Sequence, residues 1–82
     1  MKSGYYGALT VNTLESIEIQ VNGAARLVAR QRTIADLLQD LNVGNRRVAV
    51  ELDGRIVPRS LHGETEISAG AIVEVITAVG GG

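Results

Sequence analysis

The chain contains no cysteine, tryptophan or phenylalanine, and it has one proline and one histidine among its 82 residues. Without cysteine, the chain itself forms no disulfide, zinc–thiolate site or thioester. The only aromatic side chains, Tyr5 and Tyr6, lie in the first segment, so the core must consist of Leu, Ile, Val and Ala. A chain this short buries only about 60% of its unfolded surface, which leaves little room for an enclosed active site. These absences favour a carrier or accessory protein over an enzyme.

Charges of both signs are nearly balanced, with 8 basic and 9 acidic residues and a formal net charge of −1. Binding to nucleic-acid phosphates needs a basic face, so this balance argues against a nucleic-acid partner. No stretch approaches the roughly 18 apolar residues of a membrane span, and the first residues lack the apolar run of a signal peptide. The sequence therefore predicts a cytoplasmic protein with no membrane partner.

Two β-hairpins are predicted from runs in which apolar and polar residues alternate on either side of a tight turn. The hairpins comprise residues 17–30 and residues 47–57. Their turn pairs, Asn22-Gly23 and Asp53-Gly54, supply the two positive φ values of a type I′ turn. Pro58 follows the second hairpin and marks its return strand as short or as an edge strand.

One helix is predicted to begin at Thr33, whose hydroxyl can cap the first turn, with Asp36 in the position of a capping box. The apolar residues that follow helical spacing are Ile34, Leu37, Leu38 and Leu41. We expect the helix to end near Asn42, with Gly44 available for a left-handed stop.

A last apolar strand over residues 71–79 completes the order β-β-α-β-β-β. This order predicts an α+β protein of the β-grasp (ubiquitin-like) type, in which one helix covers one face of a mixed five-stranded sheet. Alternation along the last strand places Val73 and Val75 in the core and Ile72 and Ile76 on the open face. There an apolar patch can receive a partner, be covered by the arm over residues 1–15, or be a case of isolated exposure. We expect an N-terminal arm over residues 1–15, a domain over 16–79 and a flexible glycine tail over 80–82.

Other polar residues carry weaker signals. His62 has no nucleophile or metal spacing around it, so we expect a solvated loop histidine and neither a metal site nor a catalytic residue. Asp36 and Asp40 are four residues apart on the helix and could act as an acid–base pair. Helix capping by Asp36 and a solvated position for Asp40 are simpler explanations. Four arginines lie in or near the second hairpin. They form either a basic edge that matches an acidic groove on a partner or a plain solvated edge, and they are Arg46, Arg47, Arg55 and Arg59.

The last strand runs directly into Gly80, Gly81 and Gly82. Glycine has no Cβ, so such a tail can pass extended through a channel too narrow for other residues. This arrangement suits enzymes that act on a terminal carboxylate.

Together with this tail, several segments resemble the ThiS family of sulfur carrier proteins of thiamine biosynthesis. The matching segments are Ile19–Gly23, Thr33–Leu38, Val48–Ser60 and Val73–Gly82. The resemblance implies that Gly82 is adenylated and converted to a thiocarboxylate that donates sulfur for thiazole formation. Gly81 and Gly80 would thread the tail into partner sites, and Ile72, Ile76, Arg55 and Arg59 would form a partner-binding face.

The resemblance also implies the partners, which are a ThiF-type (E1-like) adenylating enzyme, a ThiG-type thiazole synthase and a sulfur donor such as cysteine desulfurase. The carrier would bind no cofactor, because ATP is used by the adenylating enzyme. Three alternatives remain at this point: the small subunit of molybdopterin synthase, a ubiquitin-like protein modifier, and an inert β-grasp interaction domain.

Overall fold

The computed structural model describes residues 15–43 and 46–77. It contains two hairpins, a helix, a short 3-10 turn and a final strand, in the predicted order. The elements are β1 (Ser16–Val21), β2 (Ala24–Ala29), α1 (Ile34–Asp40), β3 (Val48–Leu52), β4 (Arg55–Ile56), the 3-10 turn η3 (Arg59–Leu61) and β5 (Ile72–Thr77). The predicted arm and glycine tail fall largely outside the described residues, so the predicted domain limits stay a prediction.

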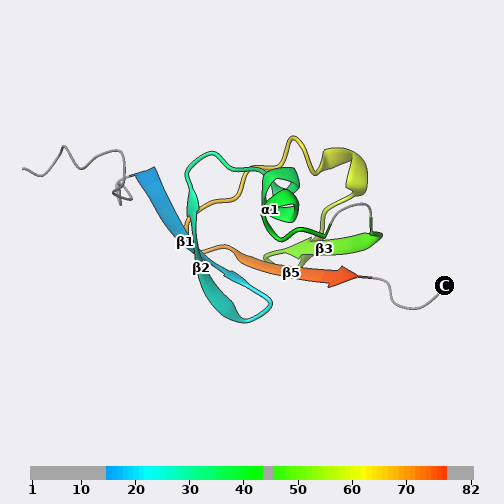
Figure 1. The fold of residues 1–82 in the computed structure, drawn as a ribbon, viewed down its shortest axis with the longest axis horizontal. Helices are drawn as coiled ribbons and strands as arrows, with labels where there is room; N and C mark the ends of the chain where they lie inside the picture. Colours follow the sequence, from blue (N-terminus) through cyan, green and yellow to red (C-terminus); the bar gives the residue numbers. More distant parts are fainter. Residues whose placement is uncertain (1–14, 44–45, 78–82) are drawn as a thin grey trace, which may run out of the picture.

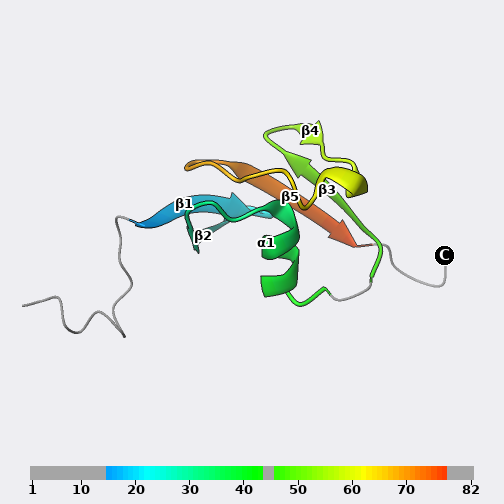
Figure 2. The same cartoon turned by 90° about the horizontal axis from the view of Figure 1, so that it is seen from above.

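The five strands form one mixed sheet in the order β2-β1-β5-β3-β4. The central strand β5 is parallel to β1 and antiparallel to β3. The helix α1 lies on one face of this sheet, and none of the described residues covers the other, open face (Figure 1; Figure 2). The predicted β-grasp architecture is therefore confirmed, with the most apolar strand at the centre, where both of its edges are paired.

Both hairpins turn as their dipeptides predict. Asn22 and Gly23 have φ values of 52° and 87°, and Asp53 and Gly54 have values of 51° and 85°. Positive φ at both central positions is the signature of a type I′ turn, whose twist matches that of the flanking strands.

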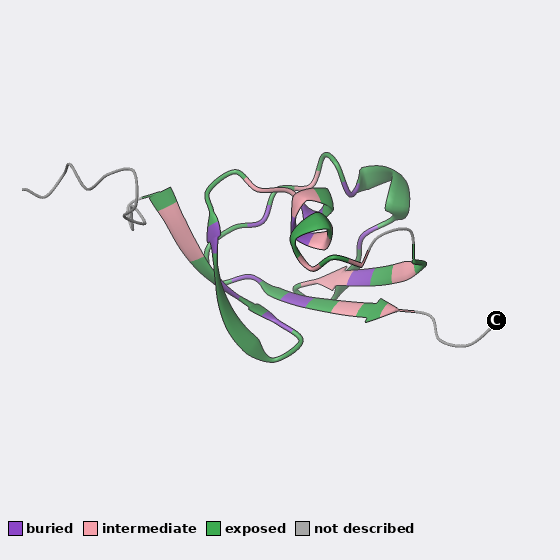
Figure 3. Cartoon of the chain, viewed as in Figure 1, coloured by how far each residue is buried: buried purple, intermediate pink, exposed green. Residues whose placement is uncertain are grey.

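The core lies between α1 and the sheet. Its completely buried large side chains come from the helix and from three strands, and they are Ile19, Ile34, Leu37, Val50 and Val73. Figure 3 shows the resulting alternation of buried and exposed residues along β5. Val73 is buried and Val75 packs against the core, as the alternation predicts.

The start of α1 is the predicted capping box. Thr33 Oγ1 accepts the N–H of Asp36 at 3.2 Å, and the Asp36 carboxylate accepts the N–H of Thr33 at 3.0 Å. This bond from the Thr33 backbone is the main reason that the pKa of Asp36 lies below its ordinary value of 3.8. The helix ends near Asn42, as predicted, with its cap at Leu41, and Asn42 itself takes a left-handed φ of 59°. Asparagine tolerates this conformation better than most residues with a Cβ, and Gly44 lies outside the described residues.

The prediction of a solvated His62 is wrong. Its side chain is buried, at 7% exposure, and its Nε2 lies 3.1 Å from the carbonyl oxygen of Val57. Since a carbonyl oxygen only accepts, Nε2 must carry the proton. The His62 carbonyl oxygen accepts the N–H of Ala35 in α1. His62 therefore joins the segment after β4 to the helix, a contact between residues far apart in the sequence that no local spacing reveals.

Candidate functional site

The strand that leads to the predicted reactive tail is β5, which is described up to Thr77. At this end of the strand Thr77 pairs with Val48, the first residue of β3. Gly80, Gly81 and Gly82 lie outside the described residues, so their roles stay a prediction. What the structure describes is how β5 is held and which surfaces surround its end.

On one side, β5 is held by the turn residue Asn22. The Asn22 N–H donates to the carbonyl oxygen of Val73 at 2.9 Å. Its side-chain amide then bonds Val75 twice, because Oδ1 accepts the Val75 N–H at 2.7 Å and Nδ2 donates to the Val75 carbonyl oxygen at 3.2 Å. The left-handed backbone of Asn22 has already turned away from β5, and its side chain continues the hydrogen-bond ladder in place of the backbone.

On the other side, β5 is held by the equivalent residue of the second turn, Asp53. The Asp53 N–H donates to the carbonyl oxygen of Ile72, and Asp53 Oδ1 accepts the Ile72 N–H, both at 2.8 Å. Both type I′ turns therefore reach β5 through a side chain. From the sequence, Asn22 and Asp53 were expected only as turn formers. Their side-chain role depends on the placement of β5 between the two hairpins.

The open face of the sheet carries exposed apolar side chains. Ile72 is 48% exposed and Ile76 is 59% exposed, as the alternation along the last strand predicts. Ile56 of β4 is 64% exposed. The pairing of Ile56 with Glu51, and of Glu51 with Glu74, puts Ile56 on the same face as these two isoleucines.

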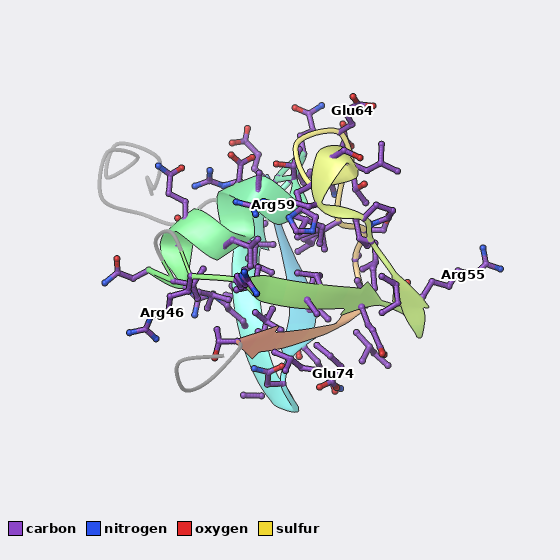
Figure 4. The ribbon with its side chains drawn as sticks, turned by 90° about the vertical axis from the view of Figure 1, so that its right-hand side faces the viewer. Arg46, Arg55, Arg59, Glu64 and Glu74 are labelled. Carbon is purple, nitrogen blue, oxygen red and sulfur yellow. The ribbon has the colours of Figure 1, made fainter. Side chains whose placement is uncertain are left out.

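Acidic side chains are interspersed with these isoleucines, and Glu74 lies between Ile72 and Ile76 on β5. Strand register places Glu18, Glu51 and Glu74 on the open face. Figure 4 shows Glu74 on the opposite side of the sheet from α1. We call this surface, defined by Ile56, Ile72 and Ile76 with the three glutamates, the open-face patch.

The four arginines do not form one basic edge. Arg46 and Arg55 lie at opposite ends of β3, and Arg59 lies on the α1 side of the sheet (Figure 4). Arg59 and Arg46 line a groove beside α1, whereas Arg47 lies with Ala49 and Ile76 near the end of β5. The predicted partner-binding face is thus divided, because Ile72 and Ile76 share the open-face patch while Arg55 and Arg59 lie elsewhere. Register pairs Arg55 with Leu52, which packs against the core, so Arg55 does not share the face of Ile72 and Ile76.

Within residues 15–43 and 46–77, no group of three or more His, Asp or Glu side chains is arranged to hold a metal ion. In the same part of the chain no helix has the length and apolar character needed to cross a membrane. Asp36 and Asp40 could have formed an acid–base pair, but both face Arg32. Asp36 Oδ1 lies 3.9 Å from Arg32 Nη1, and Asp40 Oδ2 lies 3.8 Å from Arg32 Nη2. Each aspartate therefore forms an exposed ion pair with Arg32 at the surface of the helix.

Comparison with known proteins gives consistent results. A model of the ThiS family matches residues 19–82. Among solved structures, the chain is similar to the crystal structure of thiamine biosynthesis protein ThiS from Geobacter metallireducens, with a TM-score of 0.69 and 32% identity. This match covers 80% of the chain and 100% of that structure.

Two curated relatives differ in length. The chain is 33% identical over 66 residues to a thiazole synthase of Paramagnetospirillum magneticum, and this region is 80% of the chain but only 20% of that protein. The chain therefore spans one fifth of the length of this relative. It is 34% identical over 68 residues to the uncharacterized protein ycf40 of Porphyra purpurea, which covers 83% of the chain and 96% of the relative.

Proposed function

The chain belongs to the ThiS family, and from this premise we propose that it is a sulfur carrier of thiamine biosynthesis whose Gly82 holds the sulfur as a C-terminal thiocarboxylate. The observation that carries the proposal is the family match over residues 19–82, which extends through the glycine tail. The central position of β5 supports it, because a strand paired on both edges is a rigid base for the tail that follows.

The chemistry begins with an unreactive group. A C-terminal carboxyl has a pKa near 3.5, so at neutral pH it is an ionised and poor electrophile. Adenylation overcomes this, since a Gly82 carboxylate oxygen bonds the α-phosphorus of ATP and pyrophosphate leaves. A persulfide sulfur of the donor then attacks the acyl carbon and AMP leaves. A thiol of the donor system then attacks the donor sulfur of the resulting acyl disulfide, which forms a disulfide within the donor system and releases the thiocarboxylate. The chain has no cysteine, so both sulfur groups belong to partners.

The catalytic groups of this scheme are likewise placed on partners. They are a ThiF-type adenylating enzyme that uses ATP, a cysteine desulfurase or similar sulfur donor, and a ThiG-type thiazole synthase as the acceptor of sulfur. The thiazole synthase of P. magneticum supports the last partner, because a region similar to this chain is part of that protein. The carrier itself is proposed to bind no cofactor and to act as a substrate in the cytoplasm.

The open-face patch is the proposed docking surface for the adenylating enzyme. Ile76 pairs with Ala49 at the end of the β3–β5 ladder from which the tail continues. An enzyme that receives the tail must approach this end. The exposed isoleucines of the patch and the glutamates between them fit a partner surface that carries both apolar side chains and Lys or Arg side chains.

The test is an intact-mass measurement after incubation with ATP, the adenylating enzyme and a sulfur donor. The expected result is a mass gain equal to the replacement of one oxygen atom by sulfur. Deletion of Gly82 should abolish this gain. If the mass stays unchanged while the same enzymes modify their own carrier, the sulfur-carrier proposal fails and an inert interaction domain takes its place.

A further inference from the structure

A groove lies on the α1 side of the sheet, between the helix, η3 and the start of β3. Its volume is about 350 Å³. Apolar side chains and the buried His62 contribute to its lining, together with four polar side chains at its rim. The lining residues used below are Leu38, Gln39, Asn42, Arg46, Val48 and Arg59.

The acidic side chains of α1 and the lining of the groove lie on different sides of the helix. The acidic residues of the helix, Asp36 and Asp40, face Arg32 and do not line the groove. The helix residues that do line it, Ala35, Leu38 and Gln39, are uncharged and recur at helical spacing, and Asn42 beyond the helix end is uncharged as well. The groove therefore has two arginines and no acidic residue in its lining.

Four hydrogen-bond donors at the rim have no partner within the described part of the chain. Arg46 and Arg59 form no ion pair there. The side-chain amides of Gln39 and Asn42 also form no hydrogen bond with the described residues. All four residues are exposed, whereas Leu38 and Val48 are partly buried beside them. An apolar floor with a rim of donors is the anatomy of a surface that receives a polar protein segment.

The groove also lies at the end of the molecule from which the tail continues. Arg46 precedes Val48 by two residues, and Val48 pairs with Thr77, the last described residue of β5. Figure 4 shows Arg46 projecting at this end and Arg59 above β3, on the same side as α1. An enzyme that takes hold of the tail passes beside both arginines.

We propose that this groove receives an acidic segment of the enzyme that adenylates Gly82. The assignment rests on the proposed function. A protein segment fits better than a small molecule, because the groove is open to solvent and its rim side chains are exposed, whereas small-molecule sites enclose most of their ligand. The carboxylates of the segment would pair with Arg46 and Arg59, and apolar side chains beside them would contact Leu38 and Val48. The enzyme would then hold the β3–β5 end from both sides of the sheet, through this groove and through the open-face patch.

The experiment measures the steady-state rate of adenylation through the release of pyrophosphate. The probe is the adenylating enzyme from the same genome. The test variant combines Arg46→Glu and Arg59→Glu. The control combines Arg26→Glu with Lys2→Glu, which changes the net charge equally. Arg26 is exposed on β2 and does not line the groove. Urea unfolding of both variants establishes that each is folded.

The expected result is a rise in KM of about tenfold or more for the test variant, with kcat unchanged at saturation, because the contacts contribute equally to ground-state and transition-state binding. Its KM should also respond less to added salt than that of the wild type. A different result would overturn only the groove assignment and leave the proposed function standing. In that result, wild type and control are adenylated, and the test variant either has the same KM as the control or shows a lower kcat in place of a higher KM. If the wild-type chain is not adenylated by an enzyme that is active on its own carrier, the proposed function fails and the groove assignment fails with it.

Discussion

Replacing Asn22 by glycine removes one side chain that holds β5, the strand that leads to Gly82. Glycine adopts the φ of 52° at this position without strain, so the turn itself is preserved as a Gly-Gly type I′ turn. The change deletes the bonds of 2.7 Å and 3.2 Å between the Asn22 amide and the backbone of Val75. Asn22→Gly therefore tests the side-chain contact separately from the backbone conformation.

The loss of stability follows from these two bonds. Each net hydrogen bond contributes about 0.5–1.5 kcal/mol, and their exposure to water favours the lower half of this range. The additional freedom of glycine in the unfolded chain costs about 0.4–1 kcal/mol more. We expect the free energy of unfolding to fall by about 2 kcal/mol, a large fraction of the stability of so small a domain.

Asp53→Gly is the matched control, because Asp53 has φ of 51° and also precedes a glycine. It removes the bond to the Ile72 N–H and leaves Asn22 in place. Urea unfolding measures both losses, and amide hydrogen exchange assigns them. Exchange at Val75 should accelerate more in Asn22→Gly, and exchange at Ile72 should accelerate more in Asp53→Gly.

The reasoning is refuted by either of two results. One is a stability loss in Asn22→Gly below the part that glycine entropy alone explains, about 0.4 kcal/mol. The other is an equal acceleration of amide hydrogen exchange at Val75 in both variants. This would mean that β5 opens as a whole and that the Asn22 side chain does not stabilise it locally.

Four further predictions concern the helix, the core, the tail and the open face. The pKa of Asp36 is lowered in the folded chain, so the stability it contributes is present above its ordinary pKa of 3.8 and is lost as the pH falls through the folded value. Asp36→Asn should therefore flatten the acid side of the stability–pH curve, and an unchanged acid side would contradict this role. His62→Ala should lower the free energy of unfolding by about 2–4 kcal/mol, because it opens a cavity and leaves the Val57 carbonyl oxygen without its bond; a loss below about 0.5 kcal/mol would rule this out. Gly81→Val should leave the urea midpoint unchanged and abolish adenylation, so undiminished pyrophosphate release would exclude the threading role. Ile76→Ser should alter stability by less than about 0.5 kcal/mol because the side chain is 59% exposed, yet raise KM for adenylation; an unchanged KM would remove Ile76 from the docking surface.

Local signals predict most of the fold because each acts over a few residues. The pairs Asn22-Gly23 and Asp53-Gly54 carry the positive φ values that their turns need. Thr33 and Asp36 cap the helix through bonds that span only three residues. Alternation along the last strand separates Val73 from Ile72 because neighbouring side chains of a strand point to opposite faces.

Contacts between distant residues account for what the sequence did not reveal. His62 stands in a polar segment that reads as an exposed loop, and only the packing of that segment against α1 buries it. The four arginines are close in sequence, but the folded chain brings Arg46 and Arg59 to one groove and leaves Arg55 at the opposite end of β3 from Arg46 (Figure 4). Neither outcome follows from residue type or spacing.

The sequence by itself determined the elements, their order, the family and the glycine tail, because periodicity, turn dipeptides, capping and motif matches are properties of neighbouring residues. Only the tertiary structure decided that Asn22 and Asp53 hold β5 from both sides and that Arg46 and Arg59 share a groove. The physical reason is that these contacts depend on the placement of β5 between the two hairpins and of α1 on one face of the sheet. That placement comes from burial of one common core, to which β1, β2, α1, β3 and β5 all contribute.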